Sequence, residues 1–438
     1  MDDLDAADIG ARIYDFAAQI YPICRSITGD GVRETLRHVG DQVVLQTHEV
    51  PTGTRAFDWT VPREWSIRDA FIKNSAGDRV VDFHTCNLHI VSYSAPVHGY
   101  FSLTDLKRHI FTLPDRPELI PYRTSYYQES WGFCMAHNQL QALPDGMYEV
   151  LIDSTLCDGA LTYGEHLHQG ESADTVLLSA HICHPSMAND NCSGIALLTQ
   201  LAKRLTGIRT RYTYRFIFAP GTIGALAWLS RNESLTPHIA HGLVVSGVGD
   251  PGGPTYKKTR RGDAEIDRAM THVLRHEASS AKIIDFFPYG YDERQYCSPG
   301  FNLPVGLFQR SQFGTFPEYH TSADNLDLIQ PIYLAESYRI LASTLDVLEG
   351  NMLVRNLLPK GELQLGQRGL YGPTGGDPAA AAKAMALLWV LNLGDGQHTL
   401  LDIATRADMP FHVIRSAAEQ LAAHGVLEYV HQSAICSH

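Results

Sequence analysis

The residues best suited to chemistry lie in one stretch, residues 176–194, which reads VLLSAHICHPSMANDNCSG. Its apolar start predicts a buried strand that ends at His181, and a polar loop with His184 and Asp190 follows. Histidine and carboxylate groups at the carboxyl end of a sheet strand occupy the place where α/β folds bind their ligands. This stretch therefore predicts one half of a ligand site.

A second compact set of polar residues lies far downstream, in the segment PEYHTSADN at residues 317–325. It contains Glu318, His320 and Asp324. Imidazole and carboxylate groups are ligands that zinc prefers, because the ion is borderline-soft. The two segments together therefore predict a zinc site.

The composition is that of an ordinary globular protein with an acidic balance. The 438 residues are 44% apolar and 19% charged, and their net charge is −13. A chain of this length exceeds the size of a single core, so two or three domains are expected. The negative charge argues against nucleic acid as the main partner. No segment approaches about 18 unbroken apolar residues, so no membrane association is expected.

Two further features favour a cytoplasmic location. The first ten residues, MDDLDAADIG, are acidic, whereas a secretory signal is basic and then apolar. The eight cysteines are scattered and form no CxxC pair. This usage is typical of reduced thiols rather than of a disulfide framework.

The hydrophobic patterns predict an α/β fold with a mostly parallel central sheet and flanking helices. From about residue 173 to 350, short apolar strands alternate with helical patterns, as in parallel sheets. Between about residues 45 and 150, short β-like runs separated by turn formers predict an inserted β-rich module. We therefore assign residues 1–45 and 151–355 to one discontinuous α/β domain and residues 46–150 to the insertion.

The C-terminal sixty residues predict a separate domain after a Gly/Pro-rich joint at residues 371–378. Three helical patterns followed by a short strand are the order of a winged helix-turn-helix, which we assign to residues 372–438. Residues 379–438 hold three Lys or Arg and five Asp or Glu, a net charge of −2. A DNA-binding domain normally carries a net positive charge. The broad apolar surface of the first helix, 379–391, instead favours packing or a homo-oligomer.

At the level of motifs, the chain resembles a known superfamily. The pattern H-x-C-H-P…A-N-D-N-x-S-G, followed by YHTSADN, is similar to that of the M28-type zinc aminopeptidases. The strings YPICRSITGDGVRETL, PYRTSYYQESWGFC and GYDERQYCSPG resemble aminopeptidase-like proteins of polysaccharide and natural-product biosynthesis clusters. Those proteins carry an inserted β domain and a C-terminal winged helix, and the resemblance covers nearly the whole chain.

The resemblance implies a metal-binding role for three residues. His181 matches the first metal histidine, Asp190 the aspartate that bridges two metals in the wider superfamily, and His320 the distal histidine. Three protein ligands plus a water are typical of an open catalytic zinc site. With these three residues we expect one zinc ion per chain.

The sequence also departs from the superfamily pattern. Cys183 stands where the superfamily has an aspartate, and Gly221 and Thr222 stand where it has a Glu-Glu pair. The first glutamate of that pair is the general base and the second is a metal ligand, so a second metal position has too few ligands. Ser246 replaces a further aspartate, unless Asp250 takes its place.

Because Gly221 cannot accept a proton, a hydrolase would need another base. Glu293, in a turn after a strand, and Glu318, two residues before His320, are the candidates, and we favour Glu293. We expect Cys183 and His184 to support the ligands rather than to bind the metal themselves.

Candidate substrate contacts come from two polar turns. The segment PYRTSYYQESWGF contributes Arg123, Tyr126 and Trp131, which combine polar and aromatic character. Arg25, in the turn CRSITG, is suited to pairing with a substrate carboxylate.

These expectations predict a zinc-dependent, exopeptidase-like hydrolase that acts on a small peptide or amino-acyl conjugate, within a biosynthetic pathway. One alternative is a catalytically altered member of the fold that binds a peptide or amino-sugar ligand, which Gly221 favours. Others are an amide-forming or acyl-transfer enzyme, and a winged-helix regulator, which the acidic tail argues against.

Overall fold

The computed structural model describes residues 6–370 and 378–430. By its internal contacts the chain divides into two compact units, Met1–Ala264 with Lys282–Arg339, and Glu265–Ala281 with Ile340–His438. Of the helices within the described residues, none is long and apolar enough to cross a membrane.

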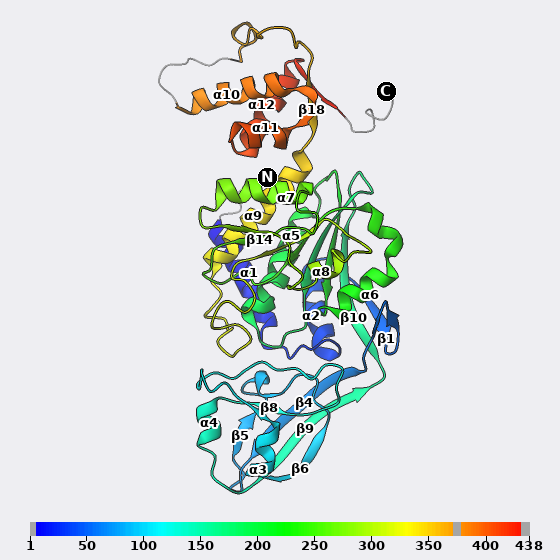
Figure 1. The fold of residues 1–438 in the computed structure, drawn as a ribbon, viewed down its shortest axis with the longest axis vertical. Coiled ribbons are helices and arrows are strands. Elements are labelled where there is room, and N and C mark those ends of the chain that lie inside the picture. Colours follow the sequence, from blue (N-terminus) through cyan, green and yellow to red (C-terminus); the bar gives the residue numbers. More distant parts are fainter. Residues whose placement is uncertain (1–5, 371–377, 431–438) are drawn as a thin grey trace. The chain divides into compact units, whose positions relative to one another are not determined.

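The first unit is built on an eight-stranded sheet with the order β1-β10-β12-β11-β13-β16-β14-β15 (Figure 1). Its four central strands run parallel: β12 (Thr213–Ala219), β11 (Thr175–His181), β13 (Ile239–Val245) and β16 (Val305–Gln309). The flanking strands are β1 (Gln46–Pro51), β10 (Ala160–His168), β14 (Thr255–Lys257) and β15 (Lys282–Ile284). The pairs β1–β10, β10–β12 and β14–β16 are antiparallel. The predicted α/β class is confirmed, with antiparallel pairs toward both edges of the sheet.

Strand β11 shows why this sequence forms a central strand. All seven of its residues are buried, and its apolar run lacks the alternation of a half-exposed strand. Helix α5 (Gly194–Leu205) packs against β11 and is buried on nearly all sides, and α1 (Ala6–Ile20) packs on α5. Helices α2 (Asp30–Gly40) and α6 (Ile223–Arg231) contact β10.

The residues between β1 and β10 form a smaller antiparallel sheet of their own. Its order is β5-β4-β9-β6, with bounds Arg79–Asp82, Glu64–Lys73, Met147–Cys157 and Val97–Ser102. Its core gathers apolar residues such as Ile72, Phe133 and Val150. The other elements are β2 (Arg55–Ala56), β3 (Trp59–Thr60), η1 (Asn87–His89), α3 (Leu103–Leu106), η2 (Lys107–His109), β7 (Ile110–Phe111), β8 (Phe133–Cys134) and α4 (His137–Gln141). We refer to residues 52–157 as the inserted module.

The remaining elements of the first unit connect its strands. They are η3 (Ala188–Ser193), η4 (Glu233–His238) and α8 (Glu293–Tyr296). Helix α9 (Pro331–Gly350) begins in the first unit and ends in the second.

The second unit contains the winged helix-turn-helix. Its elements are α7 (Glu265–Glu277), β17 (Leu353–Asn356), η5 (Gly366–Arg368), α10 (Pro378–Leu393), β18 (Asp395–Thr399), α11 (Leu400–Ala407), α12 (Phe411–Ala423) and β19 (Leu427–Val430). Strand β17 pairs with both β18 and β19, although the predicted boundary at residue 355 cuts through it. A capping box between Thr399 and Asp402 fixes the start of α11.

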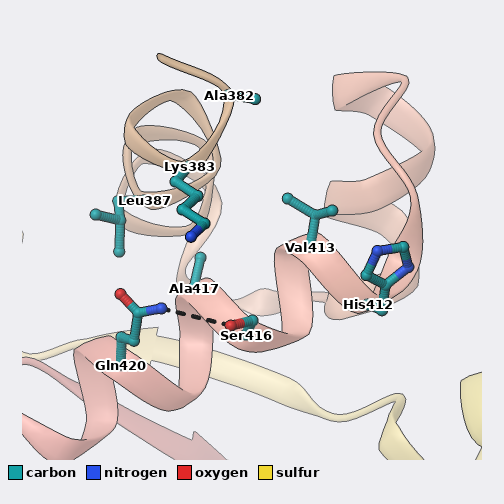
Figure 2. A pocket seen from close by; sticks show the side chains of 8 residues that line it. All are labelled: Ala382, Lys383, Leu387, His412, Val413, Ser416, Ala417 and Gln420. Carbon is teal, nitrogen blue, oxygen red and sulfur yellow. Dashed lines mark hydrogen bonds between the residues drawn. The ribbon is translucent and has the colours of Figure 1, made fainter. Parts of the chain in front are cut away.

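A groove of about 300 Å³ lies between α10 and α12 of this unit. Figure 2 shows Leu387, Val413 and Ala417 along it, with Lys383 and His412 as its ionisable groups. No carboxylate or cysteine is among the side chains that line it, so it offers little to a metal ion.

Candidate metal centre

The end of β11 and the turn η3 together position the centre. His181 is the last residue of β11, and Asp190 lies in η3, which leads into α5. The side chain of Asn191 joins these elements: its amide donates to the carbonyls of His181 and Val245 and accepts from the backbone N–H of Gly194. The loop is therefore anchored to the ends of β11 and β13 and to the start of α5.

The carboxylate of Asp190 is the point at which three imidazole groups meet. Its Oδ1 lies 2.8 Å from Nε2 of His181, and its Oδ2 lies 3.2 Å from Nε2 of His320. Nε2 of His184 lies 4.0 Å from Oδ2. His181, His184 and Asp190 are buried, and their ligand atoms all lie within 4.8 Å of one another. The structure thus brings the three predicted ligands together and adds His184 to them.

Electrostatics favours the anionic carboxylate and neutral imidazole that a metal requires. Burial would raise the pKa of Asp190, but its interactions with His184, His181 and His320 hold it well below its usual range. Burial lowers the pKa of His184 well below its usual range. His184 is therefore neutral near pH 7, with a lone pair free to bind a cation.

The donor set fits a zinc ion. Within the described residues, the ion-pair partners of Asp190 are histidines, with no lysine or arginine among them. Nδ1 of His181 is buried without a hydrogen-bond partner. Buried charges are normally paired or bind metal, and imidazole with carboxylate is a donor set of catalytic zinc.

Asp324 supports the loop rather than contributing a ligand atom. It accepts hydrogen bonds from the backbone N–H groups of Asn189, at 2.6 Å, and Asp190, at 3.1 Å. Burial raises the pKa of Asp324 to about 8, and the nearby Asp190 adds to the effect. The carboxyl group of Asp324 thereby fixes the two peptide groups on either side of Asn189.

The space left by Gly221 is filled by an aromatic ring. A Cβ atom on Gly221 would lie 1.9 Å from Cε1 of Tyr291, so no larger residue fits without moving that ring. The same ring lies against His181, with 3.8 Å between centroids. Tyr291, which the sequence analysis missed, therefore lies next to the position where the superfamily has its base.

Cys183 lies behind this ring as a neutral thiol. Its Sγ is 3.1 Å from the hydroxyl of Tyr291 and 3.7 Å from Nδ1 of His184. Burial raises the pKa of the thiol to about 12, so it is protonated near neutral pH and is a poor metal ligand.

Ser246 and Asp250 occupy different environments. The hydroxyl of Ser246 lies 3.5 Å from Oδ1 of Asp190. Asp250 instead accepts hydrogen bonds from the side chains of Asn189 and Ser311 and from the backbone of Gly252. Asp250 thus stabilises loops, and the geometry does not favour it as a replacement ligand.

The structure argues against Glu293 as the base. Its Oε1 forms a buried ion pair with Nζ of Lys257, at 2.5 Å, and its Oε2 accepts from the backbone N–H of Tyr291. Both carboxylate oxygens are thus already occupied, one by an ammonium group and the other by a backbone N–H. Glu293 stabilises the turn before α8. The half-buried Glu318 forms no ion pair within the described residues and remains the other candidate.

Two of the predicted substrate contacts are instead structural. Arg25 is buried and donates to the carbonyls of Ile20 and His184 and to the sulfur of Cys192, so its guanidinium is not available to a substrate. Trp131 stacks on His109, with 3.7 Å between the rings, and packs into the core of the inserted module. Neither location could be inferred from local sequence, because both depend on distant partners.

Arg123 and Tyr126 do line a pocket beside the centre. The pocket has a volume of about 520 Å³ and is also lined by His184, His320 and Tyr291. Its walls come from the inserted module and from the α/β core. The structure adds Arg116 to this wall, a residue that carries no local sequence signal.

Backbone contacts join the module to the loop that carries His320. The backbone N–H of Tyr122 donates to the carbonyl of His320 at 2.9 Å, and Pro121 pairs with Thr321. The ring of Tyr319 stacks on His320, with 3.9 Å between centroids. The inserted module thereby helps to position His320 beside Asp190.

Comparisons with known proteins agree with this architecture. A family described as a domain of unknown function (DUF4910) matches residues 14–351, and a winged helix-turn-helix family matches residues 352–429. A Clostridium acetobutylicum protein is 49% identical over 95% of this chain and 96% of its own length. It carries the provisional name of a polysaccharide biosynthesis protein with an aminopeptidase-like domain.

Solved structures extend the comparison to the fold. A crystal structure from Clostridium acetobutylicum, provisionally named a peptidase, has a TM-score of 0.93 at 47% identity and covers 97% of this chain and 98% of that one. A zinc aminopeptidase from Bacillus subtilis has a TM-score of 0.57 at 12% identity, covering 78% of this chain and 94% of that one. The second likeness shows a shared fold.

Proposed function

We propose, from the premise that this chain belongs to the DUF4910 family and has the M28-type aminopeptidase-like fold, that it is a zinc-dependent hydrolase of a small amide. The substrate would be a short peptide or amino-acyl conjugate. The name of the Clostridium relative, a polysaccharide biosynthesis protein, supports a role in such a pathway. The observation that carries the proposal is the buried carboxylate of Asp190, which faces three imidazoles and, among the residues that the structure describes, no lysine or arginine.

His181, Asp190 and His320 would hold one zinc ion, with His184 as a further donor. When bound, zinc polarises a substrate carbonyl and lowers the pKa of a water molecule. Glu318, two residues before His320, is kept as the proposed proton acceptor for the attacking water, although its side chain is not among those that line the pocket beside the centre. Tyr291 closes the inner wall of the site and limits the space for a substrate.

The test combines metal analysis with turnover. Protein purified without chelator should contain about one zinc equivalent and should hydrolyse members of a panel of aminoacyl amides. Glu318→Gln should retain zinc and lower kcat by roughly 10²–10⁴-fold, as is typical for loss of a general base. Glu118→Gln, which removes an exposed carboxylate of the inserted module, is the matched control and should not change kcat. Full activity of Glu318→Gln would reject the assignment of the base.

A second candidate function is binding without hydrolysis. Tyr291 fills the space at Gly221, next to the place where the superfamily has its base, and this observation favours a ligand-binding member of the fold. Zinc-loaded protein that binds amides tightly in calorimetry but turns over none of the panel would support this alternative and reject the hydrolase.

We propose no nucleic acid partner for the winged helix unit, and instead a role in homo-oligomer assembly. Arg415 of α12 is paired with Glu419 at 2.9 Å, which reduces the positive charge available to phosphate groups. Met385 of α10 is 50% exposed. Sedimentation of the full chain should show a multimer that Met385→Glu weakens. Salt-sensitive binding of duplex DNA at sub-micromolar concentration would contradict this proposal.

A further inference from the structure

The pocket beside the metal centre carries an unusual charge. Two guanidinium groups, those of Arg116 and Arg123, line it, and no aspartate or glutamate does. Neither arginine has a carboxylate within 4 Å among the described residues, although the whole chain has a net charge of −13. An acidic protein thus keeps two unpaired cations in the wall of one pocket.

Both arginines are held in position while keeping free donors. Nη1 of Arg116 donates to the carbonyl of Pro317, three residues before His320. The guanidinium of Arg123 lies over the ring of Phe111, 5.1 Å from its centroid. A guanidinium has five N–H donors, so each group can still bind a ligand. Both side chains are exposed, so a ligand can reach them.

The charge of this wall decides between two kinds of substrate. A protonated amino group would need a carboxylate partner, which the pocket lining lacks, and the two arginines would repel it. A carboxylate or phosphate group would receive charge-assisted hydrogen bonds, and the planar guanidinium matches both in bidentate geometry.

We propose that the pocket selects a substrate that carries an anionic group, a carboxylate or a phosphate, beside the amide, and that Arg116 and Arg123 bind this group. The inference rests on the proposed function, because it places the substrate in the pocket at His184 and His320. On this proposal, a protein with an aminopeptidase-like fold recognises an acidic group of its substrate instead of a free amino group.

Calorimetry on the zinc-loaded full chain tests the proposal with three small probes. N-benzoylglycine carries a carboxylate, N-benzoylglycinamide is its neutral match, and benzyl phosphate carries a phosphate. We expect at least one of the two anions to bind about 10-fold more tightly than the neutral amide, the scale of one charge-assisted contact. Whichever anion binds more tightly identifies the group that the pocket prefers.

Substitutions separate binding by the arginines from binding by the metal. Arg123→Gln and Arg116→Gln should each lower the affinity for the anion by about 10-fold and leave the affinity for the neutral amide unchanged. Arg116→Lys keeps the positive charge and should lose less affinity for the anion than Arg116→Gln does. Arg108→Gln is the matched control, because Arg108 belongs to the same module, is exposed and does not line the pocket. Equal binding of anion and amide, or Gln variants that bind like wild type, would overturn the proposal.

Turnover distinguishes this inference from the proposed function. Arginine-dependent anion binding without hydrolysis of any amide would reject the hydrolase and support the anion pocket. Hydrolysis with the same kcat/KM for anionic, neutral and cationic amides would support the hydrolase and reject the anion pocket.

Discussion

Asp190 and Glu293 are both buried carboxylates, but different groups surround the buried negative charge of each. Glu293 is neutralised by Lys257 at 2.5 Å, whereas Asp190 faces three imidazoles and, within residues 6–370 and 378–430, no permanent cation. A buried charge is costly unless it is paired or binds a metal. The chain supplies the counter-charge at Glu293 itself, whereas under the proposed function a metal ion would supply it at Asp190.

A third carboxylate, Asp292, completes the comparison. Both of its oxygens are buried without a hydrogen-bond partner. Burial raises the pKa of Asp292 to about 8, and the neighbouring charge of Glu293 adds to this effect. Near pH 7 a proton therefore neutralises Asp292, so the three carboxylates would be compensated by a metal, an ammonium group and a proton.

The largest expected effect is loss of the metal from Asp190→Asn. The amide keeps the volume of the side chain but removes the negative charge. We therefore expect zinc affinity to fall by more than about 100-fold, which exceeds the usual effect of changing a residue that only hydrogen-bonds to a metal ligand. Zinc content after dialysis and competition with a chromogenic chelator measure this loss. Ser246→Ala, which removes a hydroxyl 3.5 Å from Asp190, is the control and should retain the metal. An Asn variant with one tightly bound zinc would contradict the idea that the negative charge of Asp190 is balanced by the metal ion.

Glu293→Gln should act on stability and leave zinc content unchanged. It leaves the ammonium group of Lys257 buried without its counter-charge, which typically costs about 3–5 kcal/mol. Urea unfolding of the variant measures the loss. The double variant with Lys257→Met should recover most of it, because neither charge then remains. Loss of zinc at unchanged stability would instead place Glu293 at the centre.

Asp292 should make stability depend on pH. Its pKa in the folded state, about 8, lies above its ordinary value of 3.8, so the folded protein holds a proton that the unfolded chain releases. Stability should therefore fall as pH rises from about 4 to about 8. Asp292→Asn should be more stable than wild type by a few kcal/mol at pH 8, since one pKa unit equals about 1.4 kcal/mol, and equal to it near pH 4. If the free energies of unfolding of the two proteins differed by the same amount at every pH, the pH dependence would not come from Asp292.

The smallest effect concerns Tyr291, which connects the two regions. Its backbone N–H donates to Glu293, and its ring lies on His181. Gly221→Ala should push the ring away and cost about 1–3 kcal/mol, as overpacking does, while perturbing zinc affinity. The double variant with Tyr291→Leu should relieve the strain. A Gly221→Ala protein with wild-type stability would show that the ring can move freely.

Local patterns in the sequence were sufficient for the elements and for the position of the centre. The buried apolar run predicted β11 and its end at His181, because a strand covered on both faces needs no polar alternation. Helical spacing predicted the three helices of the winged unit, and the short strand β19 was also expected, but β17 and β18 were missed.

Side-chain roles were predicted less well where they depend on distant partners. Glu293 resembled a free acid in its turn, but Lys257 neutralises it from another strand. Arg25 resembled a substrate ligand, but three groups brought together by folding use its donors. Trp131 resembled a cleft residue, but His109 and the module core cover it.

The sequence by itself therefore determined which residue types are available to bind a metal and which strand and loops carry them, since periodicity and spacing are local properties. Only the tertiary structure decided which charged and polar groups surround each of these side chains. It brought His184 and His320 to Asp190, paired Glu293 with Lys257, and left Arg116 and Arg123 unpaired in the pocket wall. The physical reason is that burial and counter-charges set the cost of an ionised group, and both arise from residues far apart in the chain.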